Sequence, residues 1–307
     1  MDNLKKALFI GCLVLIAFLP ITAPMALVGG LVFASTLDHP FIKYNKLWIN
    51  WMLKIAVVGL GFGMNLVETL NAGKNGLLLT VTSIAFVLIG GYLLYKLLKI
   101  DRNTGHLISS GTAICGGSAI AAIAPLIKAN EKQISIALGV VFLLNSLALL
   151  VFPPVGTFFN LTQHQFGLWS AIAIHDTSSV VGAALTYGDE ALKVATTVKL
   201  ARVLWIIPLS LLTVIMFKGE NNKVKIPWFI VLFVVVIVIN SYWPFSGLLS
   251  HWIPFLSKKL LVLTLFLVGS GLSIKRIKEA GWQPLVFGST LWLGVSILSL
   301  SFILFQS

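Results

Sequence analysis

The sequence predicts an all-α polytopic membrane protein with about 9–11 transmembrane segments, inverted repeats and two broken or re-entrant helices. Three observations lead to this prediction. Of the 307 residues, 58% are hydrophobic and 10% are charged, whereas soluble domains carry about 25% charged residues. Apolar runs long enough to cross a bilayer recur along the chain. Several of these runs also hold glycines or ionisable residues in their interiors.

Eleven apolar runs follow one another, separated by short linkers. A helix needs about 20 residues to cross the hydrocarbon core, and most runs meet that length, although the first two are short. No polar stretch is long enough for a separate soluble domain, so residues 1–307 are expected to form a single transmembrane domain. No small-residue cleavage site follows the first run, which favours an uncleaved span over a signal peptide. The runs are residues 7–19, 24–37, 47–66, 77–95, 105–127, 133–152, 165–187, 191–217, 227–243, 254–274 and 282–305.

The charge balance sets the expected orientation. The 22 Lys and Arg residues outnumber the 10 Asp and Glu residues, which gives a net charge of +12. Basic residues concentrate in the cytoplasmic loops of membrane proteins, so this excess does not indicate nucleic-acid binding. With the amino terminus inside, 13 basic residues fall on the cytoplasmic side and 4 on the other, apart from Lys128, Lys132 and the three basic residues that lie within spans. Cys12 and Cys115 both lie in apolar runs, which argues against a disulfide framework or a thiolate metal site.

Lys128 and Lys132 bear on how residues 105–127 enter the bilayer. If that segment crosses completely, both lysines fall outside; if it is a re-entrant hairpin, both fall inside and the count becomes 15 to 4. The second arrangement follows the positive-inside rule better. We therefore expect re-entrant hairpins at residues 105–127 and 165–187, with nine complete crossings. Two broken helices that cross the bilayer are the alternative.

Weak self-similarity supports an inverted repeat. Residues 61–66 resemble 269–274, and residues 113–118 line up with 173–178. In the hairpin arrangement, the two members of each pair have opposite orientations. Inverted repeats with paired broken helices are typical of secondary transporters, whose binding site lies where the breaks meet near the midplane. Chance similarity between Gly-rich apolar segments is the alternative.

Gly116 and Gly117 lie together inside an apolar run. Each glycine weakens a helix interior by about 1 kcal/mol, so we expect a helix break here. A half-helix that begins at Gly117 or Ser118 would aim main-chain N–H groups and a positive dipole end at a buried site, which suits an anion. Close helix packing through small residues is the alternative interpretation.

The stretch His175-Asp176-Thr177-Ser178-Ser179 is the stronger candidate. Asp176 is the one acidic residue of the ten that lies well inside an apolar segment, and intramembrane ionisable residues are usually functional. His175 can change its charge near neutral pH, and the three residues after Asp176 add hydroxyl groups. A structural polar cluster is the alternative.

Lys199 and Arg202 are three residues apart and share one face of the expected helix. Two unpaired cations in an apolar run would be costly, so they need Asp176, main-chain carbonyls or an anionic substrate as partners. Snorkelling to the headgroup layer is the alternative, and it suits Lys199 more than Arg202.

These motifs resemble those of a known family. Residues 111–122, 173–184 and 195–203 are similar in order and spacing to signature segments of YeiH-type bacterial membrane proteins, a family named for sulfate export. The likeness covers most of the chain. That family is grouped with bile-acid-symporter and cation/proton-antiporter folds. The resemblance implies a transporter with interleaved scaffold and core parts that moves by an elevator step, and it also implies that broken helices can cross the bilayer fully.

Together, these features predict a secondary active transporter of a small anion, with sulfate or a related sulfur oxyanion first. His175 and Asp176 are expected to couple transport to proton movement. One alternative is a cation/proton antiporter on the same scaffold, in which Asp176 binds Na⁺ or H⁺ and Arg202 is a structural counter-ion. A passive anion channel is the other. The expected substrate-binding residues are Thr112, Cys115, Gly116, Gly117, Ser118, Thr177, Ser178, Ser179, Lys199 and Arg202.

No metalloprotease, P-loop or serine-hydrolase motif occurs, so the chain is not expected to be an enzyme, and no cofactor or metal is implied. The expected partners are the small anion and the lipid bilayer of a bacterial inner membrane, without nucleic acid. The identity of the substrate, the direction of transport, the coupling ion and the assembly state are left open, with a homodimer as one alternative.

Overall fold

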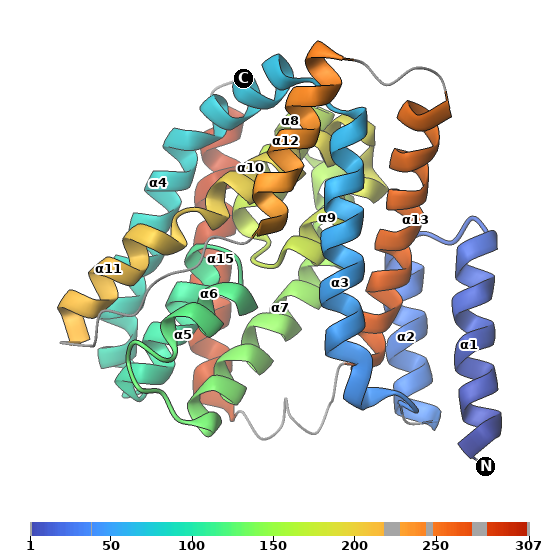
Figure 1. Ribbon diagram of the computed structural model, residues 1–307. Coiled ribbons are helices and arrows are strands. Elements are labelled where there is room, and N and C mark those ends of the chain that lie inside the picture. Colours follow the sequence, from blue (N-terminus) through green and yellow to red (C-terminus); the bar gives the residue numbers. More distant parts are fainter. Residues whose placement is uncertain (1, 38, 218–227, 244–247, 272–280, 306–307) are drawn as a thin grey trace.

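The computed structural model describes residues 2–37, 39–217, 228–243, 248–271 and 281–305, and all regular secondary structure in these ranges is helical (Figure 1). The prediction of an all-α polytopic fold is therefore confirmed. The helices are α1 (Asp2–Phe18), α2 (Ala23–Leu37), α3 (Ile42–Leu60), η1 (Gly61–Gly63), α4 (Leu66–Leu97), α5 (Arg102–Ala113), α6 (Gly117–Ile123), α7 (Glu131–Phe158), α8 (Gln163–Ala173), α9 (Thr177–Tyr187), α10 (Asp189–Val203), α11 (Ile206–Phe217), α12 (Trp228–Tyr242), α13 (Leu248–Gly271) and α15 (Trp282–Phe305).

Five helical stretches of the described chain are long and apolar enough to cross a membrane. The other predicted crossings correspond to shorter or more polar helices: α2 and α12 have 15 residues each, and α3 carries three lysines. At 1.5 Å per residue, 15 residues span about 22 Å, which is less than the hydrocarbon thickness of about 30 Å. The five long stretches are Thr69–Leu97, Glu131–Phe158, Asp189–Phe217, Trp252–Gly271 and Trp282–Phe305.

The run at 191–217 is not one continuous helix, as the apolar pattern suggested. Its helix is interrupted at Leu204 and Trp205, which separate α10 from α11. Pro208 explains the interruption, because its ring has no N–H and clashes with the carbonyl four residues earlier. A further break follows α3, where η1 leads into the extended residue Met64. This break lies in the repeat segment 61–66, whose counterpart 269–274 extends beyond the described residues.

One group of helices packs closely through small residues. Helices α2 and α13 touch where Gly30 faces Gly269, because a side-chain carbon at Gly269 would overlap the carbonyl oxygen of Leu27. Such contacts let two membrane helices approach without a hydrophobic driving force. Asn45 ties α3 to the same helix, since its Nδ2 donates to the carbonyl of Leu267 at 2.9 Å. Figure 1 shows α1, α2, α3 and α13 on one flank of the molecule.

In the rest of the molecule, α7 packs against α5, α6, α9 and α15. Figure 1 shows α5 and α6 in the lower half of the view and α8 in the upper half. A large hydrophobic cluster joins α5, α7, α8, α9 and α10. The two groups of helices meet at Gly182 of α9, where a side-chain carbon would crowd Leu149 of α7 and Leu265 of α13. Small side chains at this boundary allow α9 to approach its neighbours closely.

Candidate functional site

Helices α5 and α6 form the first hairpin (residues 102–127). Asp101 caps α5 by accepting from the N–H of Thr104 at 2.9 Å, and the same carboxylate accepts from Nε2 of Gln133 in the first turn of α7 at 2.8 Å. The amide of Asn103 also reaches the carbonyl of Ile127, beyond the end of α6, at 3.4 Å. The chain therefore enters and leaves this segment on the same side, as the hairpin prediction for 105–127 required.

Helices α8 and α9 form the second hairpin (residues 163–187), which also closes at its base. The ring of Tyr187 stacks on Phe166 with centroids 3.8 Å apart, and its hydroxyl donates to the carbonyl of Leu161 at 2.6 Å. The N–H of Glu190 donates to Oε1 of Gln163 at 3.0 Å. Because α7 begins beside the base of the first hairpin and ends beside the base of the second, the two hairpins point in opposite directions.

Arg202 of α10 joins the tips of the two hairpins. Its Nε and Nη2 donate to the carbonyl of Ala113, at the end of α5, at 2.8 and 2.5 Å. Its Nη1 donates to the carbonyl of Ile172, in the last turn of α8, at 2.7 Å. The guanidinium is fully buried. One side chain thus satisfies carbonyls from both half-helices, which explains how a cation is accommodated in an apolar segment.

Lys199 makes the same kind of contact with the second hairpin alone. Its Nζ donates to the carbonyls of Ala171 and Ile174 at 3.2 and 2.7 Å, and the side chain is fully buried. The last carbonyls of a helix have no partner within it and carry the negative end of the helix dipole. The sequence left Asp176, main-chain carbonyls and an anionic substrate open as partners of the two cations. The structure shows main-chain carbonyls in hydrogen bonds with both Lys199 and Arg202.

Asp176 caps the N-terminus of α9. Its carboxylate accepts a hydrogen bond from the N–H of Ser179 at 3.2 Å and from the hydroxyls of Ser178 and Ser179. This is an N-cap, in which an anionic side chain satisfies orphan N–H groups at the positive end of the helix. Asp176 and Thr177 are partly exposed, whereas His175 is fully buried.

The beginning of α6 differs, because no side chain caps it. Gly116 precedes it with φ 62° and ψ −121°, a conformation that side chains oppose, and its N–H donates to the carbonyl of Gly111 at 2.8 Å. Gly117 is partly exposed and Ser118 is exposed. The helix break expected at the two glycines is therefore present, and Gly116 supplies the backbone freedom that it needs.

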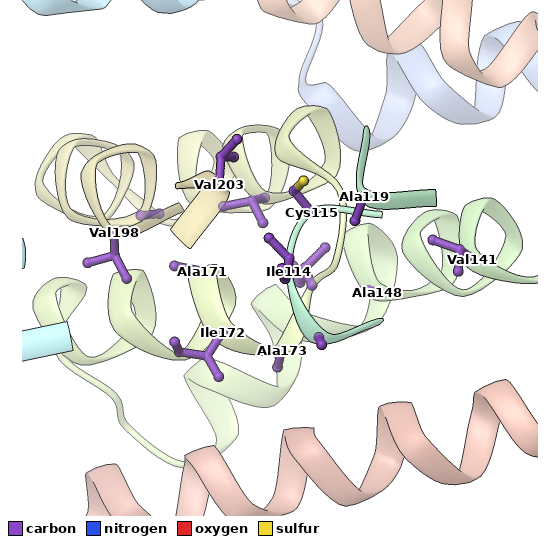
Figure 2. Packing of buried hydrophobic residues seen from close by; sticks show 14 of the residues in the cluster. Ile114, Cys115, Ala119, Val141, Ala148, Ala171, Ile172, Ala173, Val198 and Val203 are labelled. Carbon is purple, nitrogen blue, oxygen red and sulfur yellow. The ribbon is translucent and has the colours of Figure 1, made fainter. Parts of the chain in front are cut away.

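The predicted residues of both hairpins share one electrostatic environment around Cys115. Its buried thiol lies in the fields of Lys199, Arg202 and Asp176, and the charges of both cations also act on His175. Figure 2 shows Cys115 and its neighbours in the first hairpin packed near residues 171–173 of the second and near α10.

Several buried polar atoms around the tips have no hydrogen-bond partner within the described residues. They belong to α5, α7, α10 and the break in the second hairpin. Buried polar groups are nearly always paired, so a cluster of exceptions calls for an explanation such as a ligand or water. The atoms are Ser110 Oγ, Thr112 Oγ1, Asn145 Nδ2, both ring nitrogens of His175, and Thr197 Oγ1.

For Asn145 the sequence suggested a hydrogen bond between helices and no role in the site. Its Oδ1 accepts from the N–H of His175 at 3.0 Å and from the N–H of Asp176 at 3.3 Å. The signal that could have identified it is a lone amide in the middle of the apolar run 133–152. Neither Ser110 nor Thr197 was singled out either, because hydroxyl side chains commonly bond to their own helix.

A small cavity lies away from these residues. It has a volume of about 40 Å³ and lies between α4, α5 and α11, with Tyr92, Tyr95, Arg102, His106 and Phe217 in its lining. His106 Nε2 is 2.9 Å from the hydroxyl of Thr213 there. Among the described residues, no group of three or more His, Cys, Asp and Glu side chains is placed to hold a metal ion.

The fold and the paired hairpins define a polytopic helical membrane protein with two broken helices that meet in its interior. Residues 17–288 match the family described as Conserved hypothetical protein 698, so the chain belongs to that family. No solved structure matches the chain.

Similar proteins occur in several bacteria. A UPF0324 membrane protein of Bacteroides thetaiotaomicron is 49% identical over 288 residues, which cover 93% of this chain and 87% of that protein. One from Photobacterium profundum is 49% identical over 292 residues, covering 94% and 89%. One from Shewanella oneidensis is 46% identical over 295 residues, covering 96% and 93%. These relatives and the apolar helices identify the chain as a multi-pass bacterial membrane protein.

Proposed function

We propose that this protein is a secondary active transporter of a small anion, with sulfate or a related sulfur oxyanion as the first candidate. The observation that carries the proposal is the meeting of two oppositely directed hairpins at Arg202, beside buried polar atoms that have no partner within the described part of the chain. Paired broken helices of opposite direction form the midplane sites of many secondary transporters.

The carbonyl ends of α5 and α8 and the N-termini of α6 and α9 would have different roles. Lys199 and Arg202 occupy the carbonyl ends of α5 and α8, so they hold the hairpins together and leave positive charge nearby. The beginnings of α6 and α9 are partly exposed and offer N–H and hydroxyl groups. The anion would therefore bind near Gly117, Ser118 and Thr177, in the field of the two cations rather than in direct contact with them.

Asp176 would couple this binding to a proton. Its carboxylate now holds the hydroxyls of Ser178 and Ser179 and the N–H of Ser179. Protonation would weaken these contacts, remove a negative charge and release donors to the anion. Proton and anion would then bind cooperatively, and by linkage each must strengthen the binding of the other. The buried ring of His175 would be the second titrating group.

The elevator step would move the two hairpins against the group formed by α2, α3 and α13. The close packing of Gly30 and Gly269 and the Asn45 contact make that group a suitable rigid scaffold. Its boundary with the hairpins is formed by α9, whose Gly182 faces Leu149 and Leu265. Contacts between aliphatic side chains are non-directional, so this part of the boundary can slide. The exposed ion pair between Lys258 of α13 and Asp189 of α10 also crosses the boundary and would have to break during the step.

A cation/proton antiporter is the second candidate. Arg202 is satisfied by the carbonyls of Ala113 and Ile172, which is the role of structural counter-ion that this alternative assigns to it. Asp176 would then bind Na⁺ or H⁺ in turn. A passive anion channel built on the same residues would lack any coupling.

Thermal denaturation and transport together test these candidates. The purified protein should be stabilised by sulfate or another sulfur oxyanion over chloride at equal ionic strength, because a ligand stabilises the state it binds. In proteoliposomes, sulfate uptake should follow an imposed pH gradient. Sodium-dependent proton movement without anion uptake would favour the antiporter. Anion current that follows voltage and ignores the pH gradient would favour the channel.

A further inference from the structure

Asn145 lies at the contact between the two hairpins. It stands in the middle of α7 with 2% of its surface exposed. Its Oδ1 accepts two hydrogen bonds, from the N–H groups of His175 and Asp176 at 3.0 and 3.3 Å. These two residues form the break in the second hairpin, so this amide oxygen holds the break in place.

The two hydrogen bonds fix the orientation of the amide group. Two N–H donors need an acceptor, which is the amide oxygen, so Oδ1 faces them and Nδ2 faces away from them. In that direction lies Gly116 of the first hairpin, where a side-chain carbon would stand 3.6 Å from Nδ2. The nitrogen of Asn145 is thus directed between the two hairpins.

Nδ2 of Asn145 is buried and has no hydrogen-bond partner among the residues that the structure describes. Leaving a buried donor unpaired costs free energy, and a purely structural contact would need only Oδ1. The ring nitrogens of the adjacent His175 are unpaired as well. A ligand with several acceptor oxygens would accept from Nδ2 of Asn145 and from the ring N–H of His175, and Gly116, which has no side chain, is their neighbour in the first hairpin.

We infer that Asn145 is a substrate-binding residue, whose Nδ2 donates to an oxygen of the transported anion while its Oδ1 holds the second hairpin. This inference rests on the proposed transport of a sulfur oxyanion and adds a specific donor to that site. It predicts that the two atoms of one amide have separable roles, one in stability and one in affinity.

Two substitutions separate these roles. Asn145→Asp keeps an acceptor for His175 and Asp176 but replaces the donor with an oxygen, whereas Asn145→Leu removes both functions. In proteoliposomes, N145D should raise the KM for sulfate roughly tenfold or more, the loss expected for one hydrogen bond to a charged group, with a smaller change in kcat. N145L should also lower the thermal midpoint measured without sulfate.

Asn45→Asp is the matched control, because Asn45 is a buried amide of α3 that donates to Leu267, away from the hairpin tips. It should alter stability without changing the KM for sulfate. If N145D is too unstable to purify, Asn145→Ser keeps an oxygen, adds no charge and is expected to raise the KM in the same way. A wild-type KM in N145D or N145S would overturn the inference alone. Absence of sulfate transport by the wild type would overturn the proposed function with it.

Discussion

The two hairpins have the same architecture and different chemistry. Each ends its first half-helix at carbonyls that a cation from α10 satisfies. Each then breaks and begins a second half-helix, but α9 begins with the carboxylate of Asp176, whereas α6 begins at Gly116 without a side-chain cap. The comparison teaches that the repeat preserves the shape of the hairpins, while the titratable groups at the breaks belong to one of them.

This difference assigns separate tasks to the two breaks. The first break depends on backbone conformation, because Gly116 has a positive φ. Ser118, in the first turn of α6, is exposed, and α6 has no side-chain N-cap. The second depends on side-chain hydrogen bonds made by Asp176 and Asn145. Substitutions in the first hairpin should therefore act through backbone strain and the access of the anion to the break. Substitutions in the second should act through the charge of the site and its dependence on pH.

Arg202→Ala should have the largest effect, because it removes the link between both hairpins. The carbonyls of Ala113 and Ile172 would lose their partner, and a hydrogen bond to a charged group contributes about 1.5–3 kcal/mol. Thermal denaturation in detergent should show a large fall in midpoint, and Arg202→Lys should recover part of it because an ammonium lacks the planar fork. Lys193→Ala, at an exposed position of the same helix, is the control. An unchanged midpoint in Arg202→Ala would show that the contact is not structural.

Gly116→Ala should disturb the first hairpin through backbone strain. At φ 62° and ψ −121°, a side chain costs about 1–3 kcal/mol even though no neighbouring atom lies closer than 3.3 Å to the new carbon. Gly139→Ala is the control, since that helical glycine in α7 has open space around it and alanine favours the helix. Equal midpoints for the two variants would contradict the strain argument.

Asp176→Asn should change pH dependence more than stability. Asparagine caps a helix about as well as aspartate, so α9 should remain intact. The variant imitates the protonated carboxylate; sulfate affinity should be kept or improved and should vary less with pH than in the wild type. Asp189→Asn, which alters an exposed carboxylate paired with Lys258 at 2.5 Å, should leave the pH profile unchanged. A pH profile of Asp176→Asn that equals the wild type would transfer the coupling role to His175.

Two serine substitutions should have the smallest effects and should sharpen the comparison between the hairpins. Ser178→Ala removes a hydroxyl that donates to Asp176 and should cost about 0.5–1.5 kcal/mol without any anion present. Ser118→Ala removes an exposed hydroxyl and should leave that baseline unchanged, but it should reduce the stabilisation by sulfate. Thermal midpoints with and without sulfate measure both effects. A fall in the baseline midpoint of Ser118→Ala would show that the first hairpin also depends on side-chain capping.

The sequence predicted the hairpins because their signals are local. The signals are two glycines in an apolar run, a His-Asp pair in another and an excess of basic residues on one side. Each depends on free energies that act over a few residues. The break between α10 and α11 also had a local signal in Pro208, but the apolar composition of the run concealed it.

The partners of the site residues could not be predicted in the same way. The spacing of Lys199 and Arg202 places them on one helix face, yet which carbonyls they meet depends on how α10 packs against two hairpins distant in sequence. The partners of Asn145 were not predicted for the same reason. A lone amide in an apolar run suggests a hydrogen bond between helices, but its contacts with His175 and Asp176 arise only from the packing of α7.

The central claim is that the two hairpins enter from opposite sides, and labelling of single cysteines tests it most directly. Leu97→Cys and Glu131→Cys flank the first hairpin, and Phe158→Cys and Glu190→Cys flank the second; all four positions are exposed. In a Cys12→Ser background, with Cys115 buried, a membrane-impermeant maleimide added to intact cells should label positions 158 and 190. Positions 97 and 131 should react only after permeabilisation. Labelling of 97 and 131 from opposite sides would show that the first broken helix crosses the membrane and would contradict the account.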